Sequence, residues 1–474
     1  MNLKTSPVIV WFRRDLRLND NPALIEACKT GRPVICIYIY ETNIERELGG
    51  ASKWWLHHSL QRLEASLASK GASLILKKGI PKDILTDLTV TNNAKGIYWN
   101  RRYAQDGRER DAEIKTHFKS KGINVSSYRA NLLTEPWTVE TKTGGYYKVF
   151  TPYWRAAKNN IPDMYALKAP ESVPPFEAKI QSDDLKTWDL LPNKPDWGSK
   201  LKQHWQIGPN GAHNSLNQFL EGPVKDYTDD RNRPDRPKGT SHLSPHLAFG
   251  EISPREIWQK CHELSVEGDK FLSEIGWREF SYVLLFHNPQ LASKNYKPDF
   301  DKFEWEHNNE SLTAWQKGLT GYPFVDAGMR QLWQTGWQHN RVRMVTASFL
   351  IKHLLIDWRE GEKWFHDTLV DADPASNAAS WQWVAGSGAD ASPYFRIFNP
   401  FTQGEKFDPD GEYVKKYVPE LAKLPKKYIH RPWEAPINVL EYANVKLGHN
   451  YPKPIVDHKM ARERALKAYK KSRS

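Results

Sequence analysis

The sequence predicts an N-terminal doubly wound α/β domain with a parallel sheet, a long connector, and a C-terminal domain made of helices. Three observations support this fold class. Short apolar runs alternate with helical segments over the first 130 residues, a stretch from about 165 to 210 is rich in proline and lysine, and the rest follows a helical period. A chain of 474 residues is also too long for one ordinary hydrophobic core.

Five short runs are the predicted strands. PVIVWF (7–12) and VICIYIY (34–40) are rich in β-branched and aromatic residues, as buried parallel strands are. The other three predicted strands are, in order, SLILKKG, GIYWNRRY and INVSSYR. Helices are predicted between the strands. The first has Asn21 as its N-cap, another covers 51–71, and another begins at Pro81. No G-x-G-x-x-G or P-loop motif follows any strand, so a standard dinucleotide or triphosphate site is not expected there.

We expect the α/β domain to cover residues 1–135, the connector 136–205, and the helical domain 206–474. The connector should lie over the surface, because LKAPESVPPFEAK and LLPNKPDW show no periodicity. Helical patterns beyond it include SLNQFLEG, FLSEIGWREFSYVLLF, FVDAGMRQLWQTGW and the long run NRVRMVTASFLIKHLLIDWREGEKWFHDTLV.

Composition restricts the class of protein and of partner. The net charge of +12 favours an acidic polymer, with nucleic acid ahead of a membrane surface, although a basic balance can also serve solubility. Three cysteines, Cys28, Cys36 and Cys261, show neither metal-ligand spacing nor a disulfide framework, which indicates a reducing compartment and no metal. Without a membrane-spanning run or signal pattern, we expect a cytoplasmic monomer, nucleoid-associated if bacterial, with no obligate protein partner.

Tryptophan is unusually frequent. The chain has 20 of them, and half lie from Trp277 onward. An ordinary core does not need so many, whereas aromatic ligands, base stacking or electron transfer would use them.

Two segments have both a functional and a plain structural interpretation. In GTSHLS, Thr240, Ser241 and Ser244 precede a helix, where they can bind a phosphate or simply cap the helix. In FLSEIGWREF, Glu274 and Arg278 are four residues apart, the spacing of a simple ion pair on a helix. A tryptophan beside such a pair is more often part of the core than a ligand contact.

Three further segments concentrate polar and aromatic side chains. GWQHNRVRM places Asn340 and Met344 on one helix face, while Arg341 and Arg343 point elsewhere and can serve two different anions. PYFRIFNP and TQGEKFD supply cations suited to phosphate contact. DADPASNAASWQW contains two acids, an amide and two tryptophans within thirteen residues, which indicates a common functional site.

These segments together resemble the DNA photolyase/cryptochrome family. The resemblance rests on VIVWFRRDLRLNDNPAL, GTSHLSPHLAFGEISPR, WREF, TGYPFVDAGMRQL, TGWQHNRVRM, DPASNAASWQW and YFRIFNPFTQGEKFD. The motifs occur in the family order over nearly the whole chain, so the combined match is very specific although each piece alone is weak. The resemblance is strongest to bacterial class I photolyases, which repair cyclobutane pyrimidine dimers (CPDs).

The resemblance implies FAD held in a folded shape inside the helical domain. Arg343 would stabilise an anionic reduced ring, Asp371 would orient this arginine, and Asn377 would lie beside flavin N5. An amide cannot readily donate a proton, which suits an enzyme whose cofactor must stay reduced. The residues that match cofactor-binding positions are Tyr227, Thr240, Ser241, Leu243, Ser244, Arg278, Trp337, Asn340, Arg343, Asp371, Asp373 and Asn377.

The implied reaction is light-driven splitting of a CPD, a carbon–carbon lyase reaction, by electron transfer from photoexcited reduced FAD to a flipped-out lesion. Glu274 would meet the negative charge that develops on a pyrimidine carbonyl, as a hydrogen-bond donor kept protonated by burial. The matching catalytic and lesion-contacting residues are Glu274, Asn340, Met344, Trp277 and Trp383. Phosphate-contacting positions are Arg231, Arg341, Arg396 and Lys406, and the chain that supplies electrons to oxidised flavin is Trp305, Trp358 and Trp381.

Four positions distinguish branches of the family. Photolyases for (6-4) photoproducts carry histidines where this chain has Asn340 and Met344. They and the single-strand-preferring relatives usually carry tyrosine in place of Trp383. Plant and animal blue-light sensors usually carry aspartate and cysteine, respectively, in place of Asn377, and sensors tend to have long signalling tails, which we do not expect here. CPD repair is therefore favoured, with a blue-light sensor or a (6-4) photolyase as the alternatives.

The family often binds a second, light-harvesting chromophore in the α/β domain. The folate-type pattern has Asn-Glu before R-x-R-D, but here the residues are Asp106 and Gly107. GGASKWWLHH can line such a pocket, although an amphipathic helix explains it as well. By frequency in the family, 5,10-methenyltetrahydrofolate is expected first, with deazaflavin or flavin as alternatives.

Overall fold

The computed structural model describes residues 6–162, 165–264 and 269–473. The chain divides into two compact units, which we treat one at a time. Unit 1 contains Met1–Tyr147, Thr151–Glu221 and His242–Pro289, and unit 2 contains Lys148–Phe150, Gly222–Ser241 and Gln290–Ser474. The domain limits expected from the sequence stay a prediction, and their outer ends at residues 1 and 474 lie outside the described residues.

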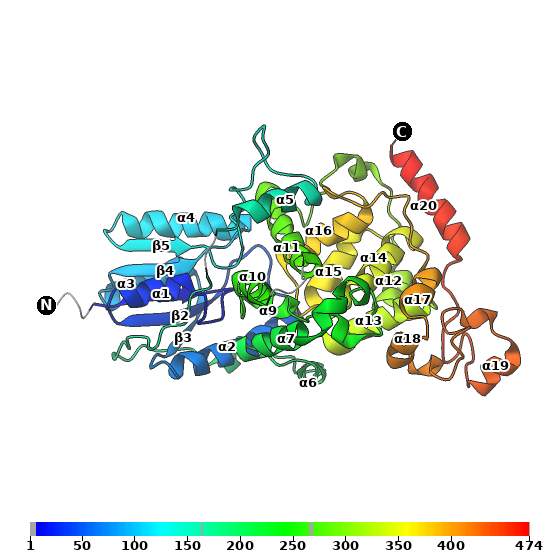
Figure 1. Cartoon of the computed structure of the whole chain (residues 1–474), viewed down its shortest axis with the longest axis horizontal. Coiled ribbons are helices and arrows are strands. Elements are labelled where there is room, and N and C mark those ends of the chain that lie inside the picture. The colour runs from blue at the N-terminus through cyan, green and yellow to red at the C-terminus, as the bar shows by residue number, and fades with distance from the viewer. Residues whose placement is uncertain (1–5, 163–164, 265–268, 474) are drawn as a thin grey trace. The chain divides into compact units, whose positions relative to one another are not determined.

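Unit 1 contains the predicted five-stranded parallel sheet (Figure 1). Its strands are β1 (Val8–Phe12), β2 (Val34–Glu41), β3 (Leu74–Gly79), β4 (Gly96–Asn100) and β5 (Asn124–Tyr128). Their order is β3-β2-β1-β4-β5, and Val8 pairs with both Val34 and Gly96. The doubly wound α/β architecture expected from the alternating pattern is confirmed.

Four helices connect the strands of this sheet. They are α1 (Pro22–Lys29), α2 (Gly50–Ala68), α3 (Pro81–Thr91) and α4 (Gln105–Lys119). Helix α1 begins where predicted, because the side chain of Asn21 accepts a hydrogen bond from the Leu24 amide at 3.2 Å. Helix α1 packs on β1 and β4, α2 and α3 pack on β3, and α4 packs on β5.

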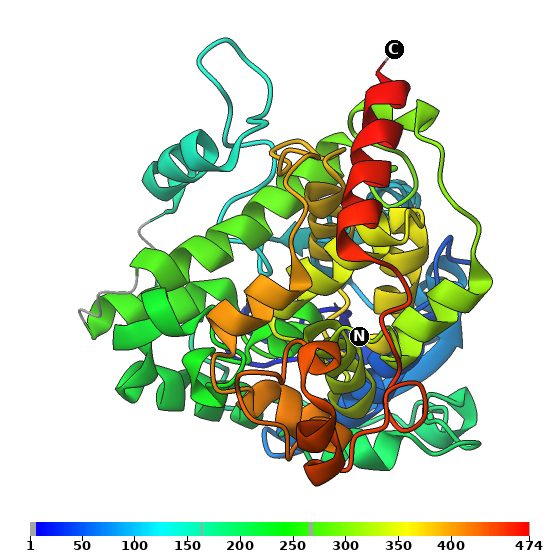
Figure 2. The same ribbon diagram turned by 90° about the vertical axis from the view of Figure 1, so that its right-hand side faces the viewer.

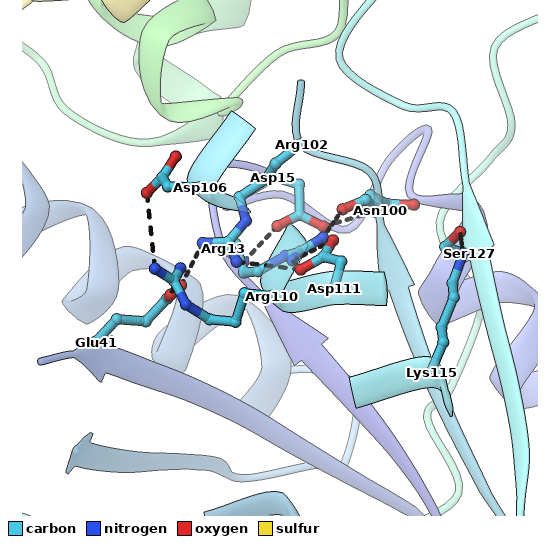
Figure 3. Close-up of polar contacts among 10 residues, drawn as sticks. All are labelled: Arg13, Asp15, Glu41, Asn100, Arg102, Asp106, Arg110, Asp111, Lys115 and Ser127. Atoms are coloured by element: carbon cyan, nitrogen blue, oxygen red, sulfur yellow. Dashed lines mark hydrogen bonds and ion pairs between the residues drawn. The ribbon is translucent and has the colours of Figure 1, made fainter. Parts of the chain in front are cut away.

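Protein side chains fill the point where the strand order reverses, between β1 and β4. Doubly wound sheets commonly bind ligands there, at the carboxyl ends of the strands. Arg13 directly follows β1, is buried, and contacts Asp111 of α4 at 2.7 and 2.9 Å (Figure 3). Arg13 also donates to the carbonyl oxygen of Asn100, whose amide donates to Asp15.

A second layer of ion pairs surrounds this arginine. Glu41 at the end of β2 pairs with Arg102 and Arg110, and Arg110 also lies 3.6 Å from Asp106 (Figure 3). Burial alone would lower the pKa of Arg102, but Glu41 and Asp111 outweigh it and hold this pKa above its ordinary value. The carboxyl end of the sheet is therefore closed by paired charges, in agreement with the missing glycine-rich motif.

The proline-rich segment after β5 covers the free edge of β3. The Asp183 amide donates to the Leu76 carbonyl at 2.8 Å, and the Asp183 carboxylate accepts from the Lys78 amide at 2.8 Å. Trp188 is buried and stacks on Tyr40 at 5.4 Å. Beyond the expected course over the surface, this stretch thus supplies hydrogen-bond partners to an edge strand that would otherwise be unpaired.

The remaining helices of unit 1 are α5 (Phe150–Asn160, whose first residue belongs to unit 2), η1 (Leu185–Trp188), α6 (Gly198–Lys202), α7 (Pro209–Glu221), α9 (Ser244–Phe249), α10 (Pro254–Glu263) and α11 (Asp269–His287). The segment after β1 holds the end of α9, since the Leu16 amide donates to the Phe249 carbonyl at 3.2 Å and Arg17 donates to the Gly250 carbonyl at 2.9 Å. Gly250 has φ of 65°, and a side chain there would collide with the backbone of Arg14.

Unit 2 consists of helices. The α-helices are α8 (Tyr227–Asp230), α12 (Asn309–Lys317), α13 (Pro323–Thr335), α14 (Asn340–Ser348), α15 (Trp358–Thr368), α16 (Pro374–Ala385), α17 (Pro400–Phe407), α18 (Glu412–Tyr417), α19 (Ile437–Tyr442) and α20 (His458–Ser472). Short turns are η2 (Pro223–Asp226), η3 (Pro237–Gly239), η4 (Pro298–Lys302), η5 (Phe349–His353), η6 (Pro419–Leu421) and η7 (Pro432–Glu434). Among the described residues, no helix combines the length and apolar character needed to cross a membrane.

The long helical pattern that begins at Asn340 is interrupted in the structure. Helix α14 passes into the π-helical turn η5, and Leu355 then takes a left-handed conformation with φ of 53°. A new helix begins at Trp358, because the Asp357 carboxylate accepts from the Arg359 amide at 2.9 Å. The break separates α15 from α14, so that α15 can pack against α16.

The close approach of α15 and α16 depends on a glycine. A Cβ atom on Gly361 would collide with the ring of Trp381 and would also crowd Leu350. Because Trp381 is almost completely buried, its ring cannot move away without disturbing the core.

We therefore expect Gly361→Ala to destabilise unit 2. The free energy of unfolding should fall by about 1–3 kcal/mol, the usual range for overpacking a core. Urea denaturation of the variant and the parent would measure this difference. Lys363→Ala, at an exposed position on the same helix, serves as the control and should change stability by less than about 0.5 kcal/mol. Equal stability of Gly361→Ala and the parent would contradict the close packing.

A buried carboxyl group attaches α11 to the chain after β5. Glu279 is only 2% exposed, and its Oε2 accepts from the amides of Leu133 and Thr134 at 2.9 and 3.1 Å. Burial raises the pKa of Glu279 to about 7, although Arg278 and the two amides favour the charged form. The group therefore changes its charge near neutral pH inside the protein.

This shift predicts a pH dependence of stability. In the unfolded chain Glu279 titrates near its ordinary value, so from about pH 4.5 to 7 the folded state keeps a proton that the unfolded state has lost. Its stabilising contribution is complete below the unfolded pKa and is lost as the pH rises through the folded pKa.

Replacing the group with Glu279→Gln removes this titration. The stability advantage of the parent over the variant should shrink by about 3 kcal/mol between pH 4 and pH 8. Urea unfolding of both proteins across this range would measure the difference, and parallel pH curves would contradict the prediction.

Candidate functional site

In unit 2, Arg343 of α14 is held in a fixed orientation. Its Nε donates to the Gln338 carbonyl at 2.7 Å, and its Nη2 contacts both oxygens of Asp371 at 2.8 and 3.1 Å. The Asp371 side chain is 3% exposed and that of Arg343 is 25% exposed. These contacts do not use Nη1, so the guanidinium can meet a further anion while Asp371 fixes its plane. The pairing of Asp371 with Arg343 that the sequence led us to expect is present.

The amide group of Asn377 on α16 is also oriented. Its Nδ2 donates to the Glu362 carbonyl at 3.1 Å and to Glu362 Oε1 at 2.8 Å. Glu362 belongs to α15 and is buried. Because both donated bonds go to Glu362, Oδ1 is the end of the amide that points away from it. This oxygen can accept a hydrogen bond from an N–H group of a ligand.

Asp373 stabilises the start of α16. Its Oδ1 accepts from the amides of Ala375 and Ser376 at 3.0 and 2.8 Å, and Pro374 occupies the first helical position. The family resemblance implies a cofactor role for Asp373, and the structure adds this capping role. The assignment to the cofactor stays a prediction.

The two tryptophans of α16 point in different directions, since residues two apart lie about 200° apart around a helix. Trp381 is buried and contacts the rings of Phe365 and Trp315 at 5.0 and 6.2 Å. Trp383 is half-buried at the margin of the same core. One tryptophan therefore faces the interior of unit 2 and the other is accessible.

The other two residues of the predicted electron chain have different environments. Trp358 is fully buried, and its indole N–H donates to Asn295 Oδ1 at 2.9 Å. Trp305 is half-buried and packs on Phe303 with ring centroids 4.3 Å apart. The three tryptophans thus range from the interior of unit 2 to its surface, and their role in electron transfer stays a prediction.

Cations predicted to contact DNA gather around one aromatic ring. The Arg341 guanidinium lies 4.4 Å and the Lys406 ammonium 5.2 Å from the centre of the Phe407 ring. Burial, and to a lesser extent the positive charge of Arg231, lower the pKa of Arg341. Arg341 donates to Asn232 Oδ1 at 2.7 Å, and within the described part of the chain neither Arg341 nor Lys406 forms an ion pair. Such a cluster favours binding of an anion.

The remaining candidates of unit 2 occupy the ends of short elements. Tyr227 begins α8 and is buried, with the Arg231 guanidinium 5.7 Å from its ring centre. Arg396 lies before α17, and its carbonyl oxygen accepts from Lys352 at 3.0 Å. Asn340 begins α14 and is exposed. Three other candidates, Met344, Thr240 and Ser241, are half-buried, and Trp337 is buried.

Unit 1 carries the five other predicted residues. Leu243 is the N-cap residue of α9, and Ser244 is its first residue. On α11, Arg278 donates to the Asn131 carbonyl at 2.7 Å and lies 3.8 Å from Glu279. Glu274 lies 4.0 Å from Lys270, so the simple Glu274–Arg278 ion pair considered from the sequence gives way to other partners. Trp277 contacts the Phe280 ring at 5.9 Å.

Sequence reasoning missed residues that support the predicted ones. Glu362 is one of several charged residues in a helical pattern, and its partner Asn377 lies fifteen residues away, so spacing along the chain does not reveal the pair. Trp315, whose indole donates to the Thr346 carbonyl at 3.0 Å, was not considered as a neighbour of Trp381. The signal that could have indicated these supporting residues is a polar or aromatic residue at a buried position of a helical pattern. No cluster of metal-binding side chains occurs among the described residues.

Comparison with known proteins gives matches over nearly the whole chain. Residues 8–175 match the family model for DNA photolyase, and residues 271–471 match the model for the FAD binding domain of DNA photolyase. A deoxyribodipyrimidine photo-lyase of Agrobacterium fabrum is 54% identical over 99% of this chain and 98% of that protein. Cryptochrome-1 of Arabidopsis thaliana is 39% identical over 97% of this chain and 70% of that protein.

Solved structures agree with these matches. A bacterial class III photolyase from Agrobacterium tumefaciens has a TM-score of 0.97 and 53% identity, over 100% of this chain and 98% of that one. An archaeal photolyase from Sulfolobus tokodaii, described with two FAD molecules and a light-harvesting cofactor, has a TM-score of 0.82 and 30% identity over 98% of this chain and all of that one. These matches confirm the family expected from the sequence, and the chain belongs to the DNA photolyase family.

Proposed function

We propose that this protein is a deoxyribodipyrimidine photolyase, a light-dependent DNA repair enzyme that splits CPDs. One observation carries the choice of repair over light sensing within the family. Asn377 is an asparagine whose amide is fixed by the buried Glu362, at a position where sensors usually carry a different side chain. The 54% identity with a deoxyribodipyrimidine photo-lyase over nearly the full length supports the same choice.

The residues of unit 2 fit FAD. A reduced flavin carries negative charge on its ring, and Arg343 offers a partly exposed guanidinium held by Asp371. The Asn377 amide presents its oxygen to a ligand N–H and has its donor atom engaged by Glu362, so it has no proton to give. When bound in reduced form, FAD supplies the light-excited electron for splitting the dimer. The other cofactor positions matched in the sequence remain part of this proposal.

The lesion contacts that we propose are accessible side chains. Trp383 and Met344 are half-buried and Asn340 is exposed, so a flipped-out base can reach them. Trp383 offers a flat apolar ring and Met344 a polarisable sulfur for stacking. Trp277 and Glu274 of unit 1 belong to this set on the strength of their sequence motif.

DNA is the proposed macromolecular substrate. Damaged DNA is what the family acts on, and the net charge of +12 favours a polyanion. Arg231, Arg341, Arg396 and Lys406 are the proposed phosphate contacts, supported by the gathering of Arg341 and Lys406 around Phe407. Desolvation and the nearby positive charge disfavour an unpaired Arg341, and a phosphate would relieve both effects.

We also propose a second, light-harvesting chromophore, with 5,10-methenyltetrahydrofolate first because it is frequent in the family. The α2 segment gives little support for a pocket, since Trp54 and Trp55 are buried and the Trp55 indole donates to Glu251 at 3.0 Å. At the position of the folate pattern, Asp106 already pairs with Arg110. Deazaflavin and flavin therefore stay as alternatives.

The proposed function is tested by a repair assay on two lesions. Purified protein with reduced FAD is mixed with duplexes that contain either a CPD or a (6-4) photoproduct, and each is kept in blue light or in darkness. We expect repair of the CPD in light only. Absorbance of the small molecules released on denaturation identifies any second chromophore. Repair of the (6-4) lesion alone, or light-dependent binding of a partner protein without repair, would overturn the proposal in favour of a (6-4) photolyase or a sensor.

The proposed electron chain makes a separate prediction. Trp381→Phe removes the buried indole at the inner end of the chain, so light-driven reduction of oxidised FAD should slow by about tenfold or more, a barrier increase of about 1.4 kcal/mol. Repair by enzyme that was reduced beforehand should be unchanged. Trp188→Phe, which replaces a buried tryptophan of unit 1, is the matched control and should affect neither rate. Equal loss of both activities in Trp381→Phe would refute the chain.

A further inference from the structure

The last helix of unit 2, α20, is strongly cationic. Residues 458–473 contain seven lysines and arginines and a single acid, Glu463. None of the residues assigned above to the cofactor, lesion or DNA lies on this helix, so the proposed function does not yet account for its charge.

Some of these cations have structural partners. Arg464 donates to the His353 carbonyl at 2.7 Å, and Lys471 pairs with Glu304 at 2.7 Å. Arg473 lies 3.8 Å from Asp299. These contacts hold α20 against η4, η5 and the segment between η4 and α12.

Four other cations of α20 are exposed and form no ion pair within the described part of the chain: Lys459, Arg462, Lys467 and Lys470. At about 100° per residue, Lys459, Lys467 and Lys470 lie on the side of the helix opposite to the buried Ala461 and Ala465. Arg462 is exposed at the flank of this side. The four cations extend over about 16 Å of helix, a length that spans several phosphates of a DNA strand. The outer face of α20 is defined here by these four cations.

The inner face of α20 packs against the loop that carries Arg396. Tyr469 stacks on Tyr394 with ring centroids 4.7 Å apart and an angle of 15°, and Tyr394 is buried two residues before Arg396. Lys352 of η5 donates to the Arg396 carbonyl, while the neighbouring His353 hydrogen-bonds His458 at 2.8 Å. Helix α20 and this loop are thus neighbours within unit 2 (Figure 2).

We propose that the outer face of α20 binds the phosphate backbone of the DNA duplex beside the lesion. The inference rests on the proposed function and extends its DNA-binding surface beyond Arg231, Arg341, Arg396 and Lys406. Charge complementarity supports it, because four exposed cations of α20 form no ion pair within the described part of the chain and a duplex offers a regular array of phosphates. The contact is independent of sequence and of the lesion, so it adds affinity without taking part in the reaction.

The salt dependence of binding tests this proposal. The affinity for a CPD-containing duplex with long flanks is measured at several salt concentrations for the parent and for a variant with Lys459→Gln, Arg462→Gln, Lys467→Gln and Lys470→Gln. Each lost phosphate contact should reduce the slope of log affinity against log salt by about 0.9, so we expect a reduction of about 2 to 4 and weaker binding of the long duplex.

A matched control removes four exposed cations of unit 1, with Lys119→Gln, Lys121→Gln, Lys179→Gln and Lys186→Gln. This control should keep the parental slope, which separates a local contact from a change in net charge. On a short duplex that carries the CPD without flanks, the α20 variant should bind like the parent. If the variant with four substitutions does not fold, the single variant Lys470→Glu is measured in its place.

The outcomes separate the two proposals. An unchanged slope in the α20 variant, or an equal reduction in the control, would overturn the role of α20 and leave a solvated helix face, even if CPDs are repaired. Failure of the parent to repair CPDs would overturn the proposed function, whatever the salt slopes are. Repair of bound lesions under saturating light should be the same in the variant and the parent.

Discussion

The arrangement of the candidate site depends on where α16 begins. The Asp373 carboxylate accepts two amide hydrogen bonds of the first turn, and Pro374 prevents the helix from starting earlier. With this start fixed, Asn377 falls in the first turn, while Trp381 and Trp383 fall on different sides of the last two turns. A shift of one residue would rotate every one of these side chains by about 100°.

The neighbouring helix α15 determines what those side chains can do. Gly361 allows the Trp381 ring to lie directly against α15, and Glu362, the next residue, takes both hydrogen bonds from the Asn377 amide. A buried glutamate is costly unless its oxygens have donors, and the Asn377 amide nitrogen donates to Oε1 of Glu362. The contact between α15 and α16 thus fixes both Trp381 in the core and the Asn377 amide at the candidate site.

Charge is used differently in the two units. In unit 1, buried arginines such as Arg13 and Arg102 are matched by Asp111 and Glu41, which closes the carboxyl end of the sheet. In unit 2, Arg341, Lys406 and the outer face of α20 have no acidic partners among the described residues. These unpaired cations of unit 2 lie where a polyanion is proposed to bind.

The sequence by itself determined the features that depend on neighbouring residues. It predicted the five strands and the cap at Asn21 because strand propensity and capping are local signals, and it predicted the family because the order of the motifs can be read along the chain. Only the tertiary structure decided the features that join distant segments, such as the cover of Asp183 on the edge of β3 and the bond from Asn377 to Glu362. Edge pairing and buried hydrogen bonds are satisfied by whichever group the fold brings near, and spacing along the chain does not reveal which group that is.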